Sequence, residues 1–261
     1  MRRIRARILL VATVVAVTAF ACLRPADAAG VNDDEFKALL DQDAKIIAKA
    51  TAAVEKASGK DKKVVEKNAG NGIKSSAIII AGYANERIDG KNPTADAKAA
   101  GVRDLAIQIF HAADKKDFKA AGEMGKNLAD AKPATDPKKI DVAKAFEGIA
   151  NKDVMDNFKK ASQYGTNVED DIKANAEKAT VKPGDAALMA QRVLVLGEYS
   201  KTVIKAENAA DKKKWAEYND NMLKAAGDLL AASKKKTTPA DMKKAFTSLN
   251  SSCIACHDDF K

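Results

Sequence analysis

Apolar side chains recur every three or four residues along most of the chain. The first clear stripe runs through residues 36–54, and the last runs through residues 242–260. Mixed steps of three and four keep the apolar positions on one side of an α-helix, whereas a strand would require strict alternation. The pattern therefore predicts an all-α protein whose helices each bury one face.

Segments rich in Pro and Gly separate these stripes, at residues 89–93, 132–137, 182–185 and 237–239. Helices rarely continue through such segments. The predicted helices span residues 33–58, 61–88, 94–132 (with a break near Asp114), 138–150, 152–178, 185–209, 211–233 and 239–261. Eight helices with short connections favour two antiparallel four-helix bundles, with residues 29–150 and 151–261 as the two domains.

The first 28 residues have the pattern of a targeting segment. Four arginines precede an apolar run from Ile8 to Cys22, and small residues lead to Ala28. This order is typical of a secretory signal peptide, which predicts cleavage after Ala28 and a periplasmic location. Lipoprotein attachment at Cys22 is the alternative, and it is disfavoured because Ala19 and Phe20 make a poor lipobox.

Composition narrows the function classes. The chain has 45 Lys and Arg against 36 Asp and Glu, but the signal segment removes five Arg and Asp27. The remaining 40 basic and 35 acidic side chains give a formal charge of +5, and they alternate along predicted helices. This distribution favours a solvated surface over a nucleic-acid interface. Three Cys exclude a disulfide scaffold, and two His exclude a conventional zinc site or a multi-haem chain.

One motif carries chemistry: Cys253, Cys256 and His257 form C-x-x-C-H in the last predicted helix. Positions i, i+3 and i+4 share one face of a helix. Two thiols can therefore add to the two vinyl groups of a porphyrin while the imidazole reaches the iron. The motif predicts one covalently attached haem c, which also suits an exported chain.

Other interpretations of the same residues are weaker. A redox C-x-x-C pair is typical of a thioredoxin-like βαβ setting, which the helical pattern excludes. A disulfide between Cys253 and Cys256 on one helix would be strained and would leave His257 without a role. A zinc site would need a second pair of ligands, and only the distant His111 is left.

The C-terminal segment 244–261 resembles cytochrome c′, which carries C-x-x-C-H on a final helix a few residues before the chain end. The resemblance is strongest over residues 211–261, where the preceding helix contains Trp215, and it extends plausibly to residues 151–261. It implies a four-helix bundle with His257 as the proximal axial ligand and thioethers at Cys253 and Cys256. Lys261 stands where the family usually has an Arg close to the haem.

The resemblance leaves the sixth coordination position open. In cytochrome c′ the distal face is apolar and the iron is five-coordinate, whereas low-spin relatives use a Met from the first helix of the bundle. Met155 opens the predicted helix 152–178 and is the candidate sixth ligand, although packing in the core is its alternative role. Met189 and Met222 are interpreted as packing residues.

Arg192 interrupts an apolar stretch from Leu188 to Leu196. A buried guanidinium needs an anionic partner. A haem propionate would make Arg192 a haem-near residue. Glu198 or a carboxylate of the other bundle is the alternative partner.

These observations predict an electron carrier whose haem iron alternates between Fe(III) and Fe(II) and which exchanges electrons with a redox partner protein of unknown identity. Binding of a diatomic gas, NO or CO, at a five-coordinate haem is the alternative. An enzyme such as a peroxidase would use a distal His, which the haem domain lacks, so no catalytic residue is predicted. Residues 29–150 are open to three roles: a docking platform, a homodimer surface or a degenerate duplicate of the haem bundle.

Overall fold

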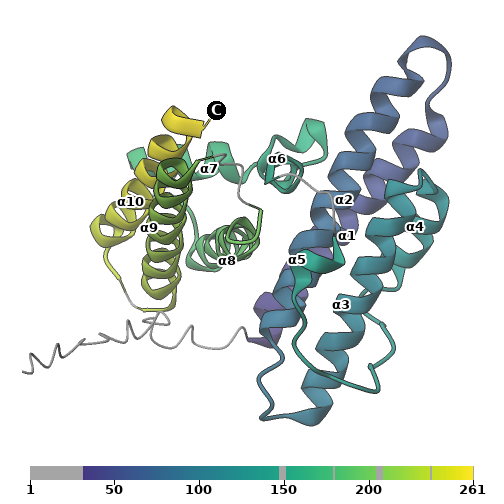
Figure 1. Ribbon diagram of the computed structural model, residues 1–261, viewed down its shortest axis with the longest axis horizontal. Helices are drawn as coiled ribbons and strands as arrows, with labels where there is room; N and C mark the ends of the chain where they lie inside the picture. The colour runs from purple at the N-terminus through teal and green to yellow at the C-terminus, as the bar shows by residue number, and fades with distance from the viewer. Residues whose placement is uncertain (1–31, 147–150, 179, 204–207, 236, 261) are drawn as a thin grey trace, which may run out of the picture.

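A computed structural model describes residues 32–260 except 147–150, 179, 204–207 and 236. Over these ranges the chain forms ten α-helices and three short 3-10 turns, without a strand (Figure 1). The all-α prediction is confirmed. The predicted signal peptide, Cys22 and Lys261 lie outside the described residues.

Three long helices and a shorter fourth make up most of the N-terminal half. They are α1 (Asp33–Lys56), α2 (Lys62–Glu86), α3 (Pro93–Asp114) and α4 (Phe118–Lys126), followed by the single turn α5 (Val142–Ala145); the 3-10 turn η1 (Gly59–Asp61) precedes α2. α1, α2, α3 and α4 pack against one another in sequence order, and α4 closes the group by packing on α1 (Figure 1). The side chains of Asn32, Asn92 and Asp117 cap the starts of α1, α3 and α4, as expected for short polar residues at helix N-termini.

The C-terminal half contains the haem motif. Its elements are α6 (Asn151–Met155), η2 (Asp156–Phe158), η3 (Ala161–Gln163), α7 (Val168–Lys178), α8 (Pro183–Ser200), α9 (Ala209–Lys234) and α10 (Pro239–Phe260). α9 packs between α8 and α10, and α7 packs on α10 (Figure 1). α6 and η2 lie between this group and α2.

Three predicted helices are wrong in extent. The predicted helix 185–209 ends at Ser200, where α8 ends. The predicted helix 152–178 is interrupted between η2 and α7, where Tyr164 and Asn167 adopt left-handed backbone conformations with φ of 61° and 66°. A Cβ on Gly165 would collide with the carbonyl oxygen of Lys159, so glycine permits this tight turn. Thr166 fixes it by donating its hydroxyl to the Asn157 carbonyl at 2.6 Å. The apolar spacing correctly indicated burial, but not a continuous helix.

The predicted helix 138–150 is reduced to the single turn α5 where the structure describes it. Side chains of the neighbouring helices hold the backbone before that turn. Arg103 donates to the Lys138 carbonyl at 2.5 Å, and the Ile140 N–H donates to Asn85 at 3.0 Å. Backbone groups engaged in this way are not available for helical hydrogen bonds.

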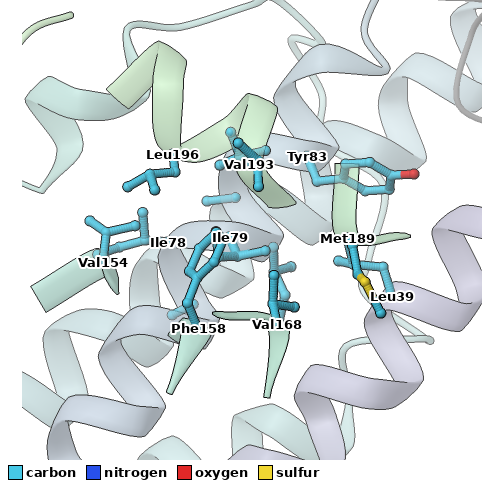
Figure 2. Packing of buried hydrophobic residues seen from close by; sticks show 14 of the residues in the cluster. Leu39, Ile78, Ile79, Tyr83, Val154, Phe158, Val168, Met189, Val193 and Leu196 are labelled. Carbon is cyan, nitrogen blue, oxygen red and sulfur yellow. The ribbon is translucent and has the colours of Figure 1, made fainter. Parts of the chain in front are cut away.

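One continuous core joins the two halves. Leu39 of α1, Ile79 of α2, Phe158 of η2 and Val193 of α8 belong to the same buried cluster and meet in the space between the two groups of helices (Figure 2). The boundary proposed at residue 150 falls within residues 147–150, outside the described part of the chain, and the division into two bundles stays a prediction. None of the helices described is both long and apolar enough to span a membrane.

Candidate haem site

The C-x-x-C-H motif lies on the last turns of α10 and faces a large cavity. Cys253, Cys256 and His257 are all partly buried, and all three line a cavity of about 1110 Å³. Ligand pockets in proteins usually measure about 300–1,000 Å³, so this one is large enough for a bulky prosthetic group. The structure therefore brings the three predicted attachment residues together at the wall of one cavity.

Every C-terminal helix supplies part of the wall. Besides the motif, the lining includes Met155, Phe158, Ile172, Val193, Leu196, Trp215, Tyr218, Asn219, Met222 and Phe260. One edge comes from the N-terminal half, through Lys67, Asn68 and Asn71 of α2. The wall is apolar where Phe158, Val193 and Leu196 lie. Elsewhere it carries polar and charged side chains from α2, α6 and α7, among them Asp153, Glu169 and Lys173.

The face of α10 that buries the core continues into the motif. Phe246 and Leu249 are fully buried, and Cys253 follows Leu249 by four residues on the same face. The end of the helix is held by Phe260, whose ring packs edge-on against Trp215 at 5.2 Å and Tyr218 at 6.0 Å between ring centroids. These contacts fix the last turn of α10, and with it the position of His257.

Polar contacts hold the same turn from outside. Asp259 accepts a hydrogen bond from the Tyr218 hydroxyl at 2.8 Å, and it forms an ion pair with Lys214 at 3.2 Å. Both donors lower the pKa of Asp259 below its ordinary value. The turn that carries His257 is therefore tied to α9 by two aromatic contacts and two charge-assisted contacts.

Burial makes the two motif thiols weak acids. It raises the pKa of Cys253 to about 11, and it also raises the pKa of Cys256. A catalytic redox thiol needs the opposite, a lowered pKa that populates the thiolate near neutral pH. The environment thus disfavours thiol redox chemistry at these cysteines.

The raised pKa predicts slow alkylation of Cys253 in the haem-free chain. Only the thiolate reacts with iodoacetamide, so near neutral pH the rate should fall below that of an unstructured peptide with an ordinary thiol pKa. The alkylation rate of Cys253 should keep rising up to a pH of about 11. Mass spectrometry of the peptide that contains Cys253 measures this rate. A rate that levels off near pH 8.5, the usual value for a free thiol, would contradict the burial seen here.

The residues present fit a haem. Two thiols and an imidazole converge on a cavity whose wall is apolar at Phe158, Val193 and Leu196, and Cys253, Cys256 and His257 would hold the group through two thioethers and one iron ligand. Asn219 also lines this cavity, and its Oδ1 is buried without a hydrogen-bond partner among the described residues.

Met155 reaches this cavity, and so does Met222. Met155 ends α6, and Met222 projects from α9, where its side chain also approaches Gly197 of α8. The sequence indicated packing for Met222. The signal that could have identified it is its spacing, three residues after Asn219 and seven after Trp215, which places all three on one face of α9. The structure thus offers two thioethers where the sequence suggested one.

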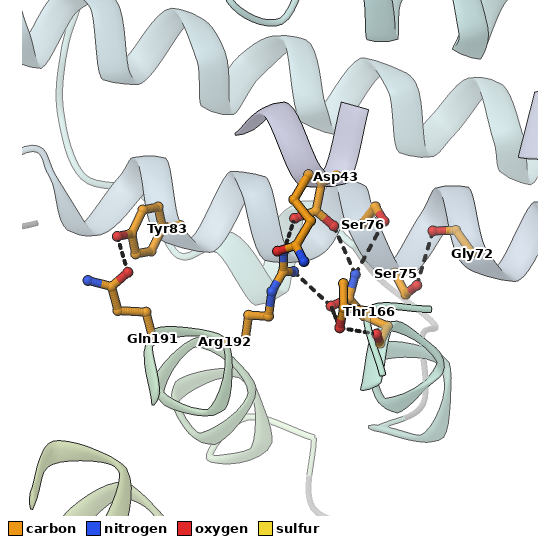
Figure 3. Close-up of polar contacts among 10 residues, drawn as sticks. Asp43, Gly72, Ser75, Ser76, Tyr83, Thr166, Gln191 and Arg192 are labelled. Atoms are coloured by element: carbon orange, nitrogen blue, oxygen red, sulfur yellow. Dashed lines mark hydrogen bonds and ion pairs between the residues drawn. The ribbon is translucent and has the colours of Figure 1, made fainter. Parts of the chain in front are cut away.

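The prediction that Arg192 lies near the haem is wrong, because the structure does not place it at the cavity of the haem motif. Its guanidinium is 1% exposed and pairs with Asp43 of α1 at 2.6 Å, and it also donates to Gln42 at 2.8 Å and Asn157 at 2.9 Å (Figure 3). The alternative partner, a carboxylate from the other group of helices, is the one observed. Asp43 is fully buried, so each charge compensates the other.

Asn219 is the residue that sequence reasoning missed. It interrupts an apolar face of α9 between Trp215 and Met222, and this polar position on an apolar stripe was its only signal. The neighbouring helix explains its orientation, because its Nδ2 donates to the Gly197 carbonyl of α8 at 2.9 Å.

The fold and the motif together define a helical protein with a c-type haem site. Comparison with known families adds a similarity in the C-terminal part of the chain: the cytochrome c′ family model matches residues 164–261. The resemblance predicted from the C-terminal sequence is thereby confirmed for that region, and it supports a haem-binding c-type cytochrome. No curated protein and no solved structure matches the chain.

Proposed function

We propose that the protein is a periplasmic electron carrier with one covalently attached haem c. The observation that carries the proposal is the convergence of Cys253, Cys256 and His257 on a cavity of about 1110 Å³. When bound, the haem supplies a one-electron Fe(III)/Fe(II) couple, and axial ligation and burial tune its potential. The match of residues 164–261 to cytochrome c′ supports the location, because that family is typically periplasmic.

The chain's own residues contribute attachment, orientation and exclusion of water. The Cys253 and Cys256 thiols would fix the macrocycle to α10, and His257 would supply the proximal ligand. Phe158, Val193 and Leu196 are each buried and line the cavity, so they would keep the iron in an apolar environment. Removal of water from the surroundings lowers the reorganisation that accompanies a change of charge at the iron.

We propose Met155 as the sixth ligand. It lies on α6, which packs against α2 and α8 instead of the haem-bearing helix, so it approaches the cavity from a different wall than His257. Met222 projects from α9, which packs directly on α10. A thioether ligand opposite an imidazole raises the potential of a c-type haem and suits electron transfer.

A visible spectrum of protein matured in a haem-attaching host tests this assignment. We expect a sharp low-spin α band in the reduced protein that persists under CO, because the sixth position is already filled. Met155→Ala should convert the spectrum to a broad high-spin form and admit CO, whereas Met222→Ala should leave the low-spin band. A low-spin spectrum that survives Met155→Ala would exclude Met155 as the ligand.

Binding of NO or CO at a five-coordinate haem is the second candidate function. The apolar wall favours it, since Phe158, Val193 and Leu196 offer no hydrogen bond to a polar sixth ligand. The same spectrum decides between the two candidates. A high-spin reduced form that binds CO in the unmodified protein would favour gas binding over electron transfer.

The partner we propose is a separate redox protein that docks where the end of α10 reaches the surface. Ile254 lines the cavity and is 52% exposed, so the motif lies close to solvent at this point. Electron transfer requires such a short path from the haem edge to the partner. No enzymatic role is proposed. A docking or dimerisation role for residues 29–150 stays a hypothesis.

A further inference from the structure

Helix α2 of the N-terminal half presents three polar side chains to the cavity of the haem motif. Lys67, Asn68 and Asn71 line this cavity. Asn71 follows Lys67 by four residues and Asn68 by three, so the three lie on one side of α2. Within the described part of the chain, none of their side chains has a hydrogen bond or an ion pair. The α2 wall therefore offers an ammonium and two amides that no protein group engages.

Lys67 differs from the other lysines of the wall in what accompanies it. Among the described residues, three more lysines line the cavity, each in a segment that also brings a carboxylate to the wall: Lys152 with Asp153, Lys159 with Asp156, and Lys173 with Glu169. The structure describes α2 throughout, and this helix brings no carboxylate to the wall. Its nearest acid in sequence, Glu66, pairs with Lys62 at 3.8 Å. The α2 wall is thus the place where an anionic group meets a cation without a competing carboxylate of the same helix.

The attachment chemistry indicates which part of the haem reaches α2. In a haem, the two vinyl groups and the two propionate groups occupy opposite edges of the macrocycle. Thioethers at Cys253 and Cys256 would hold the vinyl edge at α10, so the propionate edge points away from α10. α10 packs on α9 and α7, whereas α2 packs on α6, η2 and α8, on the other side of the cavity (Figure 1).

Exposure along the wall agrees with this orientation. Lys67 and Asn68 are exposed and Asn71 is half-buried, whereas Phe158 and Val193 of the same cavity are buried. An ionised carboxylate is costly to bury without partners, so the propionate edge favours the wall that combines donors with access to water. The apolar part of the wall suits the uncharged ring.

We infer that Lys67, together with the amides of Asn68 and Asn71, binds a propionate of the haem. An ammonium and an amide N–H both donate to a carboxylate, and the bond from the ammonium is charge-assisted. The inference rests on the proposed haem site and goes beyond it, because it makes the N-terminal half a part of the haem pocket. α2 holds the edge of the macrocycle that the thioethers leave free.

A zero-length cross-linker tests this contact in the holoprotein. A water-soluble carbodiimide condenses a carboxylate with an amine that touches it, and the carbodiimide takes up the water that amide formation releases. We expect an amide between a haem propionate and Lys67 Nζ. After digestion with trypsin, the peptide that contains Lys67 should be joined to the haem peptide of Cys253 and Cys256, at their summed mass less one water.

Two variants on α2 give the specificity of the cross-link. Lys67→Gln should lose it, whereas Lys63→Gln should retain it, because Lys63 is exposed one turn earlier and does not line the cavity. A haem joined to Lys152 or Lys173 instead, or a haem joined to no lysine, would overturn the inference.

The reduction potential gives an independent readout. A positive charge close to the haem favours the less positive Fe(II) state, so Lys67→Gln should move the equilibrium toward Fe(III) by about fivefold in a spectroelectrochemical titration. Lys63→Gln should move it less than Lys67→Gln does, and equal shifts in the two variants would contradict a local contact at Lys67. A chain that matures without any haem would overturn the proposed function instead, so the two failures are distinguishable.

Discussion

Replacement of Arg192 by Met should lower the free energy of unfolding by about 3–5 kcal/mol, the usual cost of leaving one member of a buried ion pair without its partner. Asp43 has no exposed surface and loses its 2.6 Å contact with the guanidinium. Asn157 and Gln42 each lose a donor as well. Urea denaturation followed by far-ultraviolet circular dichroism measures the change.

A matched control lies in the same helix as Asp43. Lys37 and Asp41 form an exposed i,i+4 ion pair on α1, at 2.6 Å but in contact with solvent. Lys37→Met should cost only about 0.3–0.5 kcal/mol, because water screens the pair and solvates the remaining charge. A loss of similar size in both variants would contradict the burial of the Arg192 pair.

The double variant tests the pairing itself. Asp43→Asn alone leaves a buried guanidinium without a counter-charge, and Arg192→Met alone leaves a buried carboxylate. The two changes together remove both charges, so the double variant should be more stable than the sum of the single effects predicts, by about 0.5–3 kcal/mol. Strict additivity would show that the two side chains do not interact.

Replacement of both Cys253 and Cys256 by Ser should abolish covalent attachment of haem. Serine hydroxyls do not add to the vinyl groups, so no thioether forms and acidified organic solvent should extract any haem that His257 retains. The measurement is the mass of the intact chain together with haem staining after denaturing electrophoresis. The expected effect is complete, from one haem per chain to none.

Ser251→Ala is the control for this experiment. Ser251 lies on the same helix, two residues before Cys253, and its side chain is exposed. The variant should retain the haem and its spectrum, because it alters neither the thiols nor the cavity. Haem that stayed bound to the double cysteine variant through denaturation would show that the attachment lies elsewhere.

The fold class and the attachment residues were readable from local patterns. Periodic apolar residues and Pro-containing breaks predicted most helices to within a few residues, since burial of one helical face is recorded every three or four positions. The C-x-x-C-H motif is equally local, because its three side chains share one face of a single helix. Met155 was proposed from its distance to the motif, and the structure brings it to the same cavity.

Tertiary contacts decided the remainder. Residues 159–167 satisfy the helical spacing, yet left-handed turns at Tyr164 and Asn167 break the helix there so that Phe158 and Val168 can pack in one core. The sequence predicted that Arg192 needs an anionic partner. Only the packing of α8 against α1 shows that this partner is Asp43. The free oxygen of Asn219 depends on its bond to Gly197 across two helices, which no local pattern encodes.

The sequence by itself thus determined the helices, their buried faces and the chemistry carried by α10, because each depends on residues within one or two turns of each other. The tertiary structure alone decided which side chains surround that chemistry. Partners such as Asp43 with Arg192, or Met222 with the haem motif, lie tens of residues or more apart in the chain. Their meeting is set by how whole helices pack, and the periodicity of any one helix does not contain that information.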